Sequence, residues 1–299
     1  MQDFLDPALP DRLRTQVVGR AREVEVVVAA LAAGRHVLLE GPPGTGKSTL
    51  LRALASSAGI GFEPVEGNAE LTPARLVGHH DPSRVLAEGY TDANWVDGPL
   101  ASAMRDGSLL YVEELNRVPE ETLNVLITVM SEGELHVPRL GTLTVSPGFR
   151  LVAAMNPFDA VGTARISSAI YDRTCRVVMG YQSDDEETAI VGRAVGDVDP
   201  QWTARVVELV RLTRSHPDVR IGSSVRGAID LVLVAVSLGA LRRSRPDDWS
   251  VGLDAALAAL SGRIRLHEGS TRSADDVVRE LWVKVFGEPG GDGGKAAAG

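Results

Sequence analysis

The residues most clearly suited to chemistry form one continuous run that fills the pattern G-x-x-x-x-G-K-[ST] without a mismatch. Glycines at these positions let successive backbone N–H groups and the start of a helix face an anion, where the helix dipole favours negative charge. The lysine adds a positive charge toward the β- and γ-phosphates of a nucleotide, and the serine offers a hydroxyl to Mg²⁺. The pattern therefore predicts a site for the phosphates of ATP or GTP. The predicted phosphate site comprises the eight residues of the pattern and the residue that follows them: Gly41, Pro42, Pro43, Gly44, Thr45, Gly46, Lys47, Ser48 and Thr49.

The segments on either side of this loop are typical of such a site. His36–Leu39 is a short apolar run that predicts a buried strand leading into the loop, and Thr49–Ala58 predicts the helix that leaves it. The alternative is a glycine-rich turn that binds nothing, but a bare turn has no use for a Lys-Ser pair at this spacing. We therefore expect a nucleotide site.

A second pair of chemical residues follows the apolar run Leu109–Val112. Glu113, at the strand end, is predicted to hold Mg²⁺ through its water shell, while Glu114 accepts a proton from the water that attacks the γ-phosphate. The alternative is a pair of solvated acids that open a turn. Triphosphatases of this type usually have Asp where Glu113 stands, and a longer side chain would change the Mg²⁺ position or slow hydrolysis.

Strand-like apolar runs alternate with helical segments up to about residue 180. This alternation predicts an α/β fold, a parallel sheet with helices on both faces. The expected strands are Val37–Leu39, Phe62–Val65, Leu109–Val112, Leu151–Met155 and Cys175–Met179.

After Tyr181 the strand signals stop and helical ones follow, which predicts a smaller all-helical domain. The runs Ser183–Glu186 and Ser273–Asp276 are typical of capping boxes. Apolar residues recur at helical spacing in Gln201–Arg214, Ser223–Leu241 and Val251–Ile264. We therefore expect an α/β domain over residues 1–182, a helical domain over 183–286 and a disordered glycine-rich tail over 287–299.

Composition and charge exclude several classes of protein. With 40 acids against 31 bases the chain has a net charge of −9, which argues against strong sequence-independent binding to nucleic acid. Cys175 is the only cysteine, so neither an internal disulfide nor a cysteine-based zinc site is expected. No window is apolar enough for a membrane span, and the first residues carry acids where a signal peptide would be basic. We expect a cytoplasmic protein.

At this point the motifs resemble a known family. The run Leu110–Pro119, followed by an amphipathic helix, resembles the second nucleotide motif of MoxR-type AAA+ ATPases. Four shorter runs agree with this resemblance in type and order. They are Val18-Gly19-Arg20 (the N-terminal box), Ala154-Met155-Asn156-Pro157 (sensor 1), Ile170-Tyr171-Asp172-Arg173 (the arginine-finger segment) and Gly222–Gly227 (sensor 2). The resemblance covers residues 15 to 285, and it implies an AAA+ sandwich followed by a helical lid.

The resemblance also implies roles for single residues. The backbone at Val18 and Gly19 would hold the adenine, and Asn156 would orient the attacking water. Arg173 would reach the γ-phosphate of a neighbouring subunit, and Arg226 would contact the nucleotide from the lid. The alternatives are a turn-forming Asn156, a surface ion pair of Arg173 with an acid such as Asp172, and a solvated Arg226. Arg117 is a further candidate for a contact across the subunit interface, and a role there and no role there are equally open.

Two insertions also resemble features of this clade. Val85–Val96 is expected to form two short strands around a polar turn, and Glu134–Val145 a hairpin that turns near Gly141. The resemblance implies that these are the helix-2 insert and the pre-sensor-1 hairpin, which face the central pore. Tyr90, Trp95 and Arg139 are then candidate partner contacts. Trp95 has a second interpretation, as an anchor of its hairpin on the sheet.

By resemblance, the protein hydrolyses ATP in a hexameric ring and remodels, matures or activates a partner protein, often one with a von Willebrand factor A-type domain. Two alternatives share these motifs, the ATPase subunit of a metal-chelatase-like complex and a DNA-directed AAA+ motor. A P-loop small-molecule kinase would not need Asn156, Arg173 and Arg226 in this order. Because of Glu113, an ATP-bound scaffold without turnover also stays open.

Overall fold

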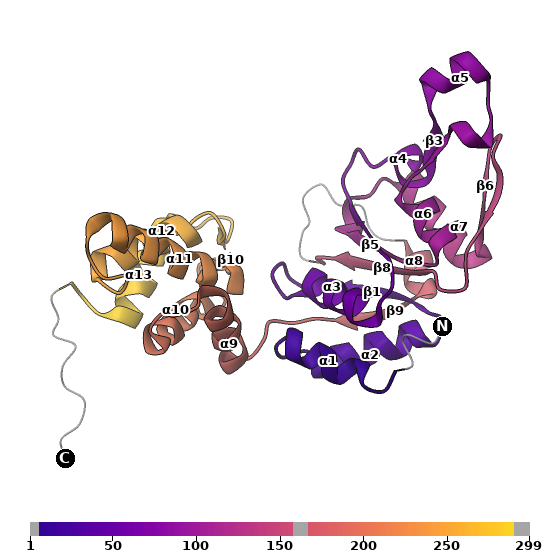
Figure 1. The fold of residues 1–299 in the computed structure, drawn as a ribbon. Helices are drawn as coiled ribbons and strands as arrows, with labels where there is room; N and C mark the ends of the chain where they lie inside the picture. The colour runs from indigo at the N-terminus through magenta and orange to yellow at the C-terminus, as the bar shows by residue number, and fades with distance from the viewer. Residues whose placement is uncertain (1–5, 158–166, 290–299) are drawn as a thin grey trace. The chain divides into compact units, whose positions relative to one another are not determined.

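A computed structural model of the chain describes residues 6–157 and 167–289. The chain divides into two compact units, residues 1–180 and 181–299. Figure 1 shows a layered α/β arrangement in the first unit and a group of helices in the second. Of the tail expected at residues 287–299, positions 290–299 lie outside the described residues.

The first unit is built on a five-stranded parallel sheet with the strand order β2-β5-β8-β1-β9. All five runs expected from the sequence form strands, with ends that differ by at most one residue. The strands are β1 (His36–Glu40), β2 (Phe62–Glu66), β5 (Leu109–Glu113), β8 (Arg150–Met155) and β9 (Thr174–Val178). Because the strands are parallel, their carboxyl ends share one edge of the sheet, the carboxyl edge, and their first residues share the opposite amino edge.

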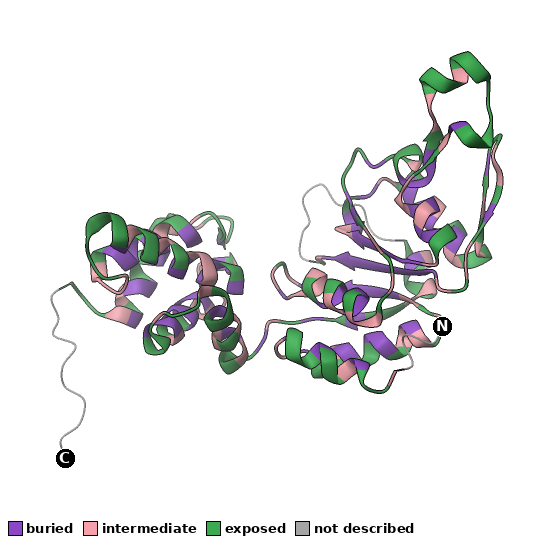
Figure 2. Cartoon of the chain, viewed as in Figure 1, coloured by how far each residue is buried: buried purple, intermediate pink, exposed green. Residues whose placement is uncertain are grey.

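Helices cover both faces of this sheet, as predicted. Alternate residues of β1 point to opposite faces, so Val37 and Leu39 enter one core cluster and Leu38 enters the other. The first face is covered by α1 (Leu9–Gln16), α2 (Ala21–Ala32) and α3 (Lys47–Ala58). The second is covered by α4 (Pro73–Val77), α6 (Pro99–Asp106), α7 (Glu120–Glu132) and α8 (Ser168–Arg173). Figure 2 shows the buried residues concentrated in the strands between these layers.

The first insertion differs from the prediction of two strands at Val85–Val96. Its strands are β3 (Gly78–His80) and β4 (Trp95–Asp97), and the segment between them contains α5 (Pro82–Glu88) and the short 3₁₀ helix η2 (Asp92–Asn94). The prediction missed a helix start. The side chain of Asp81 accepts hydrogen bonds from the backbone N–H groups of Ser83 and Arg84, and Pro82 occupies the first helical position.

The second insertion is an antiparallel hairpin of β6 (Glu134–Val137) and β7 (Gly141–Thr144), with its turn at residues 138–140. Its turn residue Arg139 places a guanidinium 3.8 Å from the ring centre of Tyr90, and so joins the two insertions. Figure 1 shows β6 beside the segment that carries α5. Trp95 is half-buried and packs against the core, which favours its interpretation as an anchor.

Within its described residues, 181–289, the second unit contains five helices and one short pair of strands. The helices are α9 (Asp184–Val195), α10 (Pro200–Leu212), α11 (Val225–Arg242), α12 (Trp249–Leu260) and α13 (Ala274–Phe286). Both expected capping boxes are present, at the starts of α9 and α13. The prediction missed β10 (Val219–Ile221) and β11 (Arg265–Leu266), which pair antiparallel and are too short to leave a period-two signal. In the part of the chain that the structure describes, no helix is both long and apolar enough to cross a membrane.

A half-buried histidine begins the strand that leads into the phosphate loop. Nδ1 of His36 accepts a hydrogen bond of 3.0 Å from the backbone N–H of Leu151, which links β1 to β8 at the amino edge. The pKa of His36 is lowered to about 4, chiefly by burial and to a smaller extent by the positive charges of Arg150 and Arg35. His36 is therefore neutral at pH 7.

This histidine makes stability depend on pH. Between pH 6.5 and 4 the unfolded chain binds the proton and the folded chain does not, so stability is lost as the pH falls through this window. From pH 7 to pH 5 we expect His36 to remove about 2 kcal/mol from the free energy of unfolding. His36→Asn keeps an acceptor for Leu151 but cannot titrate, so urea unfolding should show a smaller loss over the same range. Equal losses in both proteins would contradict this assignment.

Candidate active site

The phosphate loop lies at the carboxyl edge, between β1 and α3. Gly46 has a φ of 85° immediately before the helix, a left-handed conformation that glycine adopts at little cost. Within the described residues no side chain caps α3, whereas α9 and α13 are capped by their own serines. The N–H groups of the first turn of α3 are thus left for an anion. This donor set fits the phosphates of a nucleotide.

Lys47 is held by the loop to which it belongs. Its Nζ donates hydrogen bonds of 2.9 Å to the carbonyl oxygens of Gly41 and of Pro42. These acceptors are neutral, and a charged phosphate oxygen forms the stronger hydrogen bond with an ammonium group. Lys47 therefore fits the predicted role of a cation for the β- and γ-phosphates.

The N-terminal box is fixed to this loop by a buried arginine. Arg20 is 4% exposed, and its Nη2 donates to the carbonyl oxygens of Thr45 at 2.9 Å and Gly180 at 2.6 Å. Val18 and Gly19, whose backbone is predicted to hold the adenine, directly precede it. The sequence motif thus lies next to the phosphate loop, although the role of its backbone stays a prediction.

The two predicted metal-binding side chains are in direct contact. Oγ of Ser48 donates a hydrogen bond of 2.7 Å to Oε1 of Glu113 and lies 3.1 Å from the hydroxyl of the buried Tyr111. A hydroxyl and a carboxylate together are the oxygen donors that Mg²⁺ prefers, with water completing its coordination. The extra methylene of Glu113, compared with the usual Asp, therefore does not prevent this side chain from reaching Ser48.

Glu114 has an unusual backbone conformation for a residue other than glycine. Its φ of 52° and ψ of 45° are left-handed, and it precedes the 3₁₀ helix η3 (Leu115–Arg117). A guanidinium nitrogen of Arg117 lies 3.0 Å from a carboxylate oxygen of Glu114, and both side chains are about two-fifths exposed. An exposed pair of this kind contributes about 0–1 kcal/mol, so it can open at small cost. The predicted base is thus paired within its own subunit.

A glycine that sequence reasoning missed supports both acids from β2. The N–H of Gly67 donates to the carbonyl oxygen of Glu113 at 2.7 Å. A Cβ atom at Gly67 would lie 2.5 Å from the carbonyl oxygen of Glu114 and 2.7 Å from that of Glu113. Both distances are far below van der Waals contact, so only glycine fits here. A lone glycine after a strand gave no signal that could have identified it.

Asn156 directly follows β8, which lies between β5 and β1 in the sheet. Glu113, Asn156 and the phosphate loop therefore follow three neighbouring strands at the carboxyl edge. The side chain of Asn116 donates a hydrogen bond of 3.3 Å to the carbonyl oxygen of Asn156 and joins the two motifs. This location suits the predicted contact with the attacking water, which stays a prediction.

Arg173 lies at the amino edge. It ends α8 one residue before β9, whose first residue, Thr174, pairs with His36 at the start of β1. Its guanidinium donates to the carbonyl oxygen of Ala169 at 3.0 Å and to the hydroxyl of Ser131, while the carboxylate of Asp172 is 3.8 Å away. The alternative of an ion pair with Asp172 is therefore weak in this structure.

The fourth predicted catalytic residue, Arg226, belongs to the second unit. It is the second residue of α11 and is exposed. Among the described residues, its side chain forms no hydrogen bond or ion pair. Its proposed contact with the nucleotide stays a prediction.

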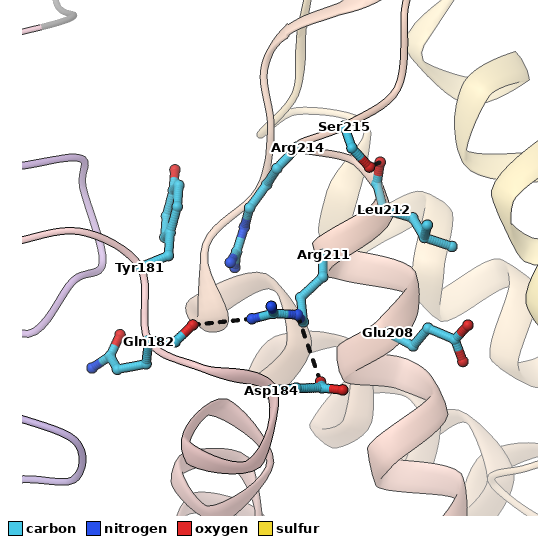
Figure 3. Close-up of a pocket in the computed structure, with 8 residues that line it drawn as sticks. All are labelled: Tyr181, Gln182, Asp184, Glu208, Arg211, Leu212, Arg214 and Ser215. Atoms are coloured by element: carbon cyan, nitrogen blue, oxygen red, sulfur yellow. Dashed lines mark hydrogen bonds and ion pairs between the residues drawn. The ribbon is translucent and has the colours of Figure 1, made fainter.

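The second unit contains a cavity of about 500 Å³ beside Tyr181, shown in Figure 3. Arg211 donates to the carbonyl oxygen of Gln182 at 3.0 Å and lies 3.1 Å from the buried carboxylate of Glu187. Arg214 lies 2.9 Å from the same carboxylate and stacks 3.9 Å from the ring centre of Tyr181. Arg211 also lies 3.6 Å from the carboxylate of Asp184, so two carboxylates offset the charges of the two arginines, and this cavity is a poor phosphate site.

The arrangement at the carboxyl edge can carry out phosphoryl transfer to water. Bound Mg²⁺ would offset the negative charge on the phosphates, and Ser48 and Glu113 would hold it. Helix α3 and Lys47 would bind the phosphates, and Glu114 would take the proton of the attacking water. Arg173, the predicted arginine finger, lies at the other end of the strands and is not part of this arrangement.

Comparison with known proteins agrees with this geometry. The sequence family described as "AAA domain (dynein-related subfamily)" matches residues 36–174. This match supports an AAA+ ATPase domain in the first unit. It is 28% identical to the uncharacterized protein YeaC of Bacillus subtilis, over 95% of this chain and 96% of YeaC. It is also 28% identical to the gas vesicle ATPase GvpN of Haloferax mediterranei, over 83% of this chain and 74% of GvpN.

Solved structures support the AAA+ fold. A protein of Cytophaga hutchinsonii, described as a candidate ATPase, matches with a TM-score of 0.52 at 21% identity, over 93% of each chain. RuvB of Thermotoga maritima, described as a Holliday junction branch migration motor, matches with a TM-score of 0.55 at 18% identity, over 83% of this chain and 73% of RuvB. At these identities the likeness concerns the fold alone.

The close approach at Gly67 generates the first prediction for this AAA+ site. Gly67→Ala should displace the backbone of Glu113 and Glu114, and lower kcat for ATP hydrolysis by about 10-fold or more, because misplacement by a few tenths of an ångström matters at a reacting centre. Binding of a fluorescent ATP analogue should change little, since the phosphate loop is untouched. Gly192→Ala is a matched control, because nothing lies within 4 Å of a Cβ there. Wild-type kcat in Gly67→Ala would refute this role.

The contact between Ser48 and Glu113 generates a second prediction. Glu113→Gln keeps the size of the side chain but removes the charge that favours Mg²⁺. The Mg²⁺ concentration that half-activates phosphate release should rise by about 10-fold or more. ATP binding measured with EDTA should stay near the wild-type value. An unchanged Mg²⁺ dependence would exclude Glu113 from the metal site.

Proposed function

We propose that this protein is a MoxR-type AAA+ ATPase that hydrolyses ATP in a hexameric ring. Motion of the helical lid, which carries Arg226, would then remodel, mature or activate a partner protein. We further propose a partner with a von Willebrand factor A-type domain and a cytoplasmic location. The ring, the partner and the location rest on the resemblance of the motifs to MoxR-type ATPases. An AAA+ domain is compatible with all three.

The observation that carries the ring proposal is the separation of Arg173 from the phosphate loop of its own subunit. The loop follows β1 at the carboxyl edge, whereas Arg173 precedes β9 at the amino edge. The five residues of β9 span about 13–16 Å between these edges at 3.3 Å per residue. An arginine at this distance can complete a site only on another subunit, where such a residue contributes roughly 10³–10⁵ in rate.

The two alternative functions share this nucleotide site and differ in what stimulates it. A DNA-directed motor would hydrolyse ATP faster with added DNA, and a metal-chelatase-like subunit would promote metal insertion into a tetrapyrrole together with its partner subunits. The net charge of −9 disfavours the first of these. The proposed function instead predicts that a partner protein raises the rate of ATP hydrolysis.

The test follows phosphate release against protein concentration, with light scattering to report the mass of the assembly. Specific activity should rise as the ring forms, since each site needs a neighbour. Glu114→Gln should lower kcat by about 100-fold or more while ATP still binds, because the general base is lost. Arg173→Ala should also lower kcat in the assembled ring. Activity that is independent of concentration in a monomer would sink the ring proposal.

A further inference from the structure

A second cavity, of about 310 Å³, lies at the amino edge of the sheet around Arg173. The turn between α2 and β1 contributes Arg35, the start of β1 contributes His36, and α7 contributes Met130. The junction of α8 and β9 contributes Asp172, Arg173 and Cys175. All of these residues belong to the first unit, and motif comparison singled out only Arg173 as a functional residue.

The charges in this cavity favour an anion. Arg35 is exposed, and its side chain forms no hydrogen bond or ion pair among residues 6–157 and 167–289. Arg173 donates to a carbonyl oxygen and a hydroxyl, both of them neutral. The one carboxylate that lines the cavity, that of Asp172, is 83% exposed and 3.8 Å from Arg173, so water screens it. Two guanidinium groups therefore face one screened carboxylate.

A third arginine, Arg150, adds positive potential next to the cavity, because a Cβ atom at the lining residue Gly34 would lie 3.4 Å from its guanidinium. Arg150 is 9% exposed, and its guanidinium donates to the carbonyl oxygens of Leu31, Pro147 and Phe149. In the described part of the chain Arg150 has no carboxylate partner, so its charge is not neutralised. Burial lowers the pKa of His36, and the positive charges of Arg150 and Arg35 lower it further. His36 stays neutral at pH 7 and adds no charge of its own.

We propose that Arg35 is a second arginine that each subunit supplies to the ATP of its neighbour. Arg35 and Arg173 together would hold the triphosphate end of that nucleotide, where negative charge develops during hydrolysis. Two planar guanidinium groups suit phosphate oxygens better than one, because each offers a fork of N–H donors. This inference rests on the proposed ring function, since the anion has to come from another subunit.

The first test compares single variants in the assembled ring. Arg35→Ala should lower kcat by about 10-fold to 100-fold, less than the roughly 10³-fold expected for Arg173→Ala. Arg35→Lys should recover only part of the rate, because lysine lacks the fork geometry. Arg279→Ala, which removes an exposed arginine of α13, should behave as wild type. Wild-type kcat in Arg35→Ala rings would overturn the proposal, as would a variant that only weakens assembly.

The second test asks whether Arg35 acts across the subunit boundary. Lys47→Ala subunits have a defective phosphate loop but an intact amino edge, and Arg35→Ala subunits have the reverse. Mixed rings should release phosphate faster than rings of either variant alone, since some intact loops then face intact arginines. If Arg173→Ala is rescued by this mixing and Arg35→Ala is not, the role of Arg35 is wrong and the ring function stands. If Arg173→Ala is not rescued, the shared site itself falls, together with this inference.

Cys175 provides a readout that does not depend on activity. It is exposed, lines the cavity and is the only cysteine of the chain. In Glu114→Gln rings with bound ATP, the neighbour should cover the cavity, so a maleimide reagent should label Cys175 more slowly than in dissociated subunits. Equal labelling rates in ATP-bound rings and in dissociated subunits would mean that no neighbour occupies this cavity and would overturn the proposal.

Discussion

The parallel pairing of β1 with β8 and β9 is the constraint on which the rest of this protein depends. Parallel strands place everything that follows them at one edge and everything that precedes them at the other. The phosphate loop, Glu113 and Asn156 follow their strands and gather at the carboxyl edge. Arg173 precedes β9 and Arg35 precedes β1, so both lie at the amino edge. One sheet thus holds the two halves of the proposed catalytic site at a distance that no side chain can span.

This separation has a consequence for assembly. A surface that presents a nucleotide at one edge and arginines at the other is complementary to a copy of itself arranged head to tail. Such heterologous contacts close into a ring when the rotation between subunits allows it. The proposed hexamer is therefore a natural outcome of the sheet topology and does not need a separate oligomerisation domain.

A partly buried hydrogen bond connects the end of β1 to α8. Glu40, the last residue of β1, is 2% exposed and accepts a hydrogen bond of 2.9 Å from the hydroxyl of Tyr171. Tyr171 belongs to α8, the helix that ends at Arg173. The same contact and burial raise the pKa of Tyr171, so its hydroxyl stays a donor at neutral pH. The strand that leads into the phosphate loop and the helix that ends at Arg173, the proposed arginine finger, are therefore linked within one subunit.

Local patterns in the sequence were sufficient for the phosphate loop, the five strands and both capping boxes, because each depends on residues adjacent in the chain. They also identified Glu113 and Glu114 as candidates, whereas Asn156 and Arg173 became candidates through the resemblance of short motifs to a known family. The sequence prediction missed α5 because the helix cap at Asp81 was overlooked. It missed β10 and β11 because these strands are too short to show a period-two pattern.

Only the tertiary structure decided which distant residues meet. The need for glycine at position 67 arises from the backbone of β5 beside it, and the pair of Arg139 and Tyr90 joins insertions far apart in the chain. Arg35 becomes a candidate solely because β1 and β9 start side by side. Contacts of this kind depend on strand order and register, which arise from packing across the whole sheet and leave no trace in any short run of sequence.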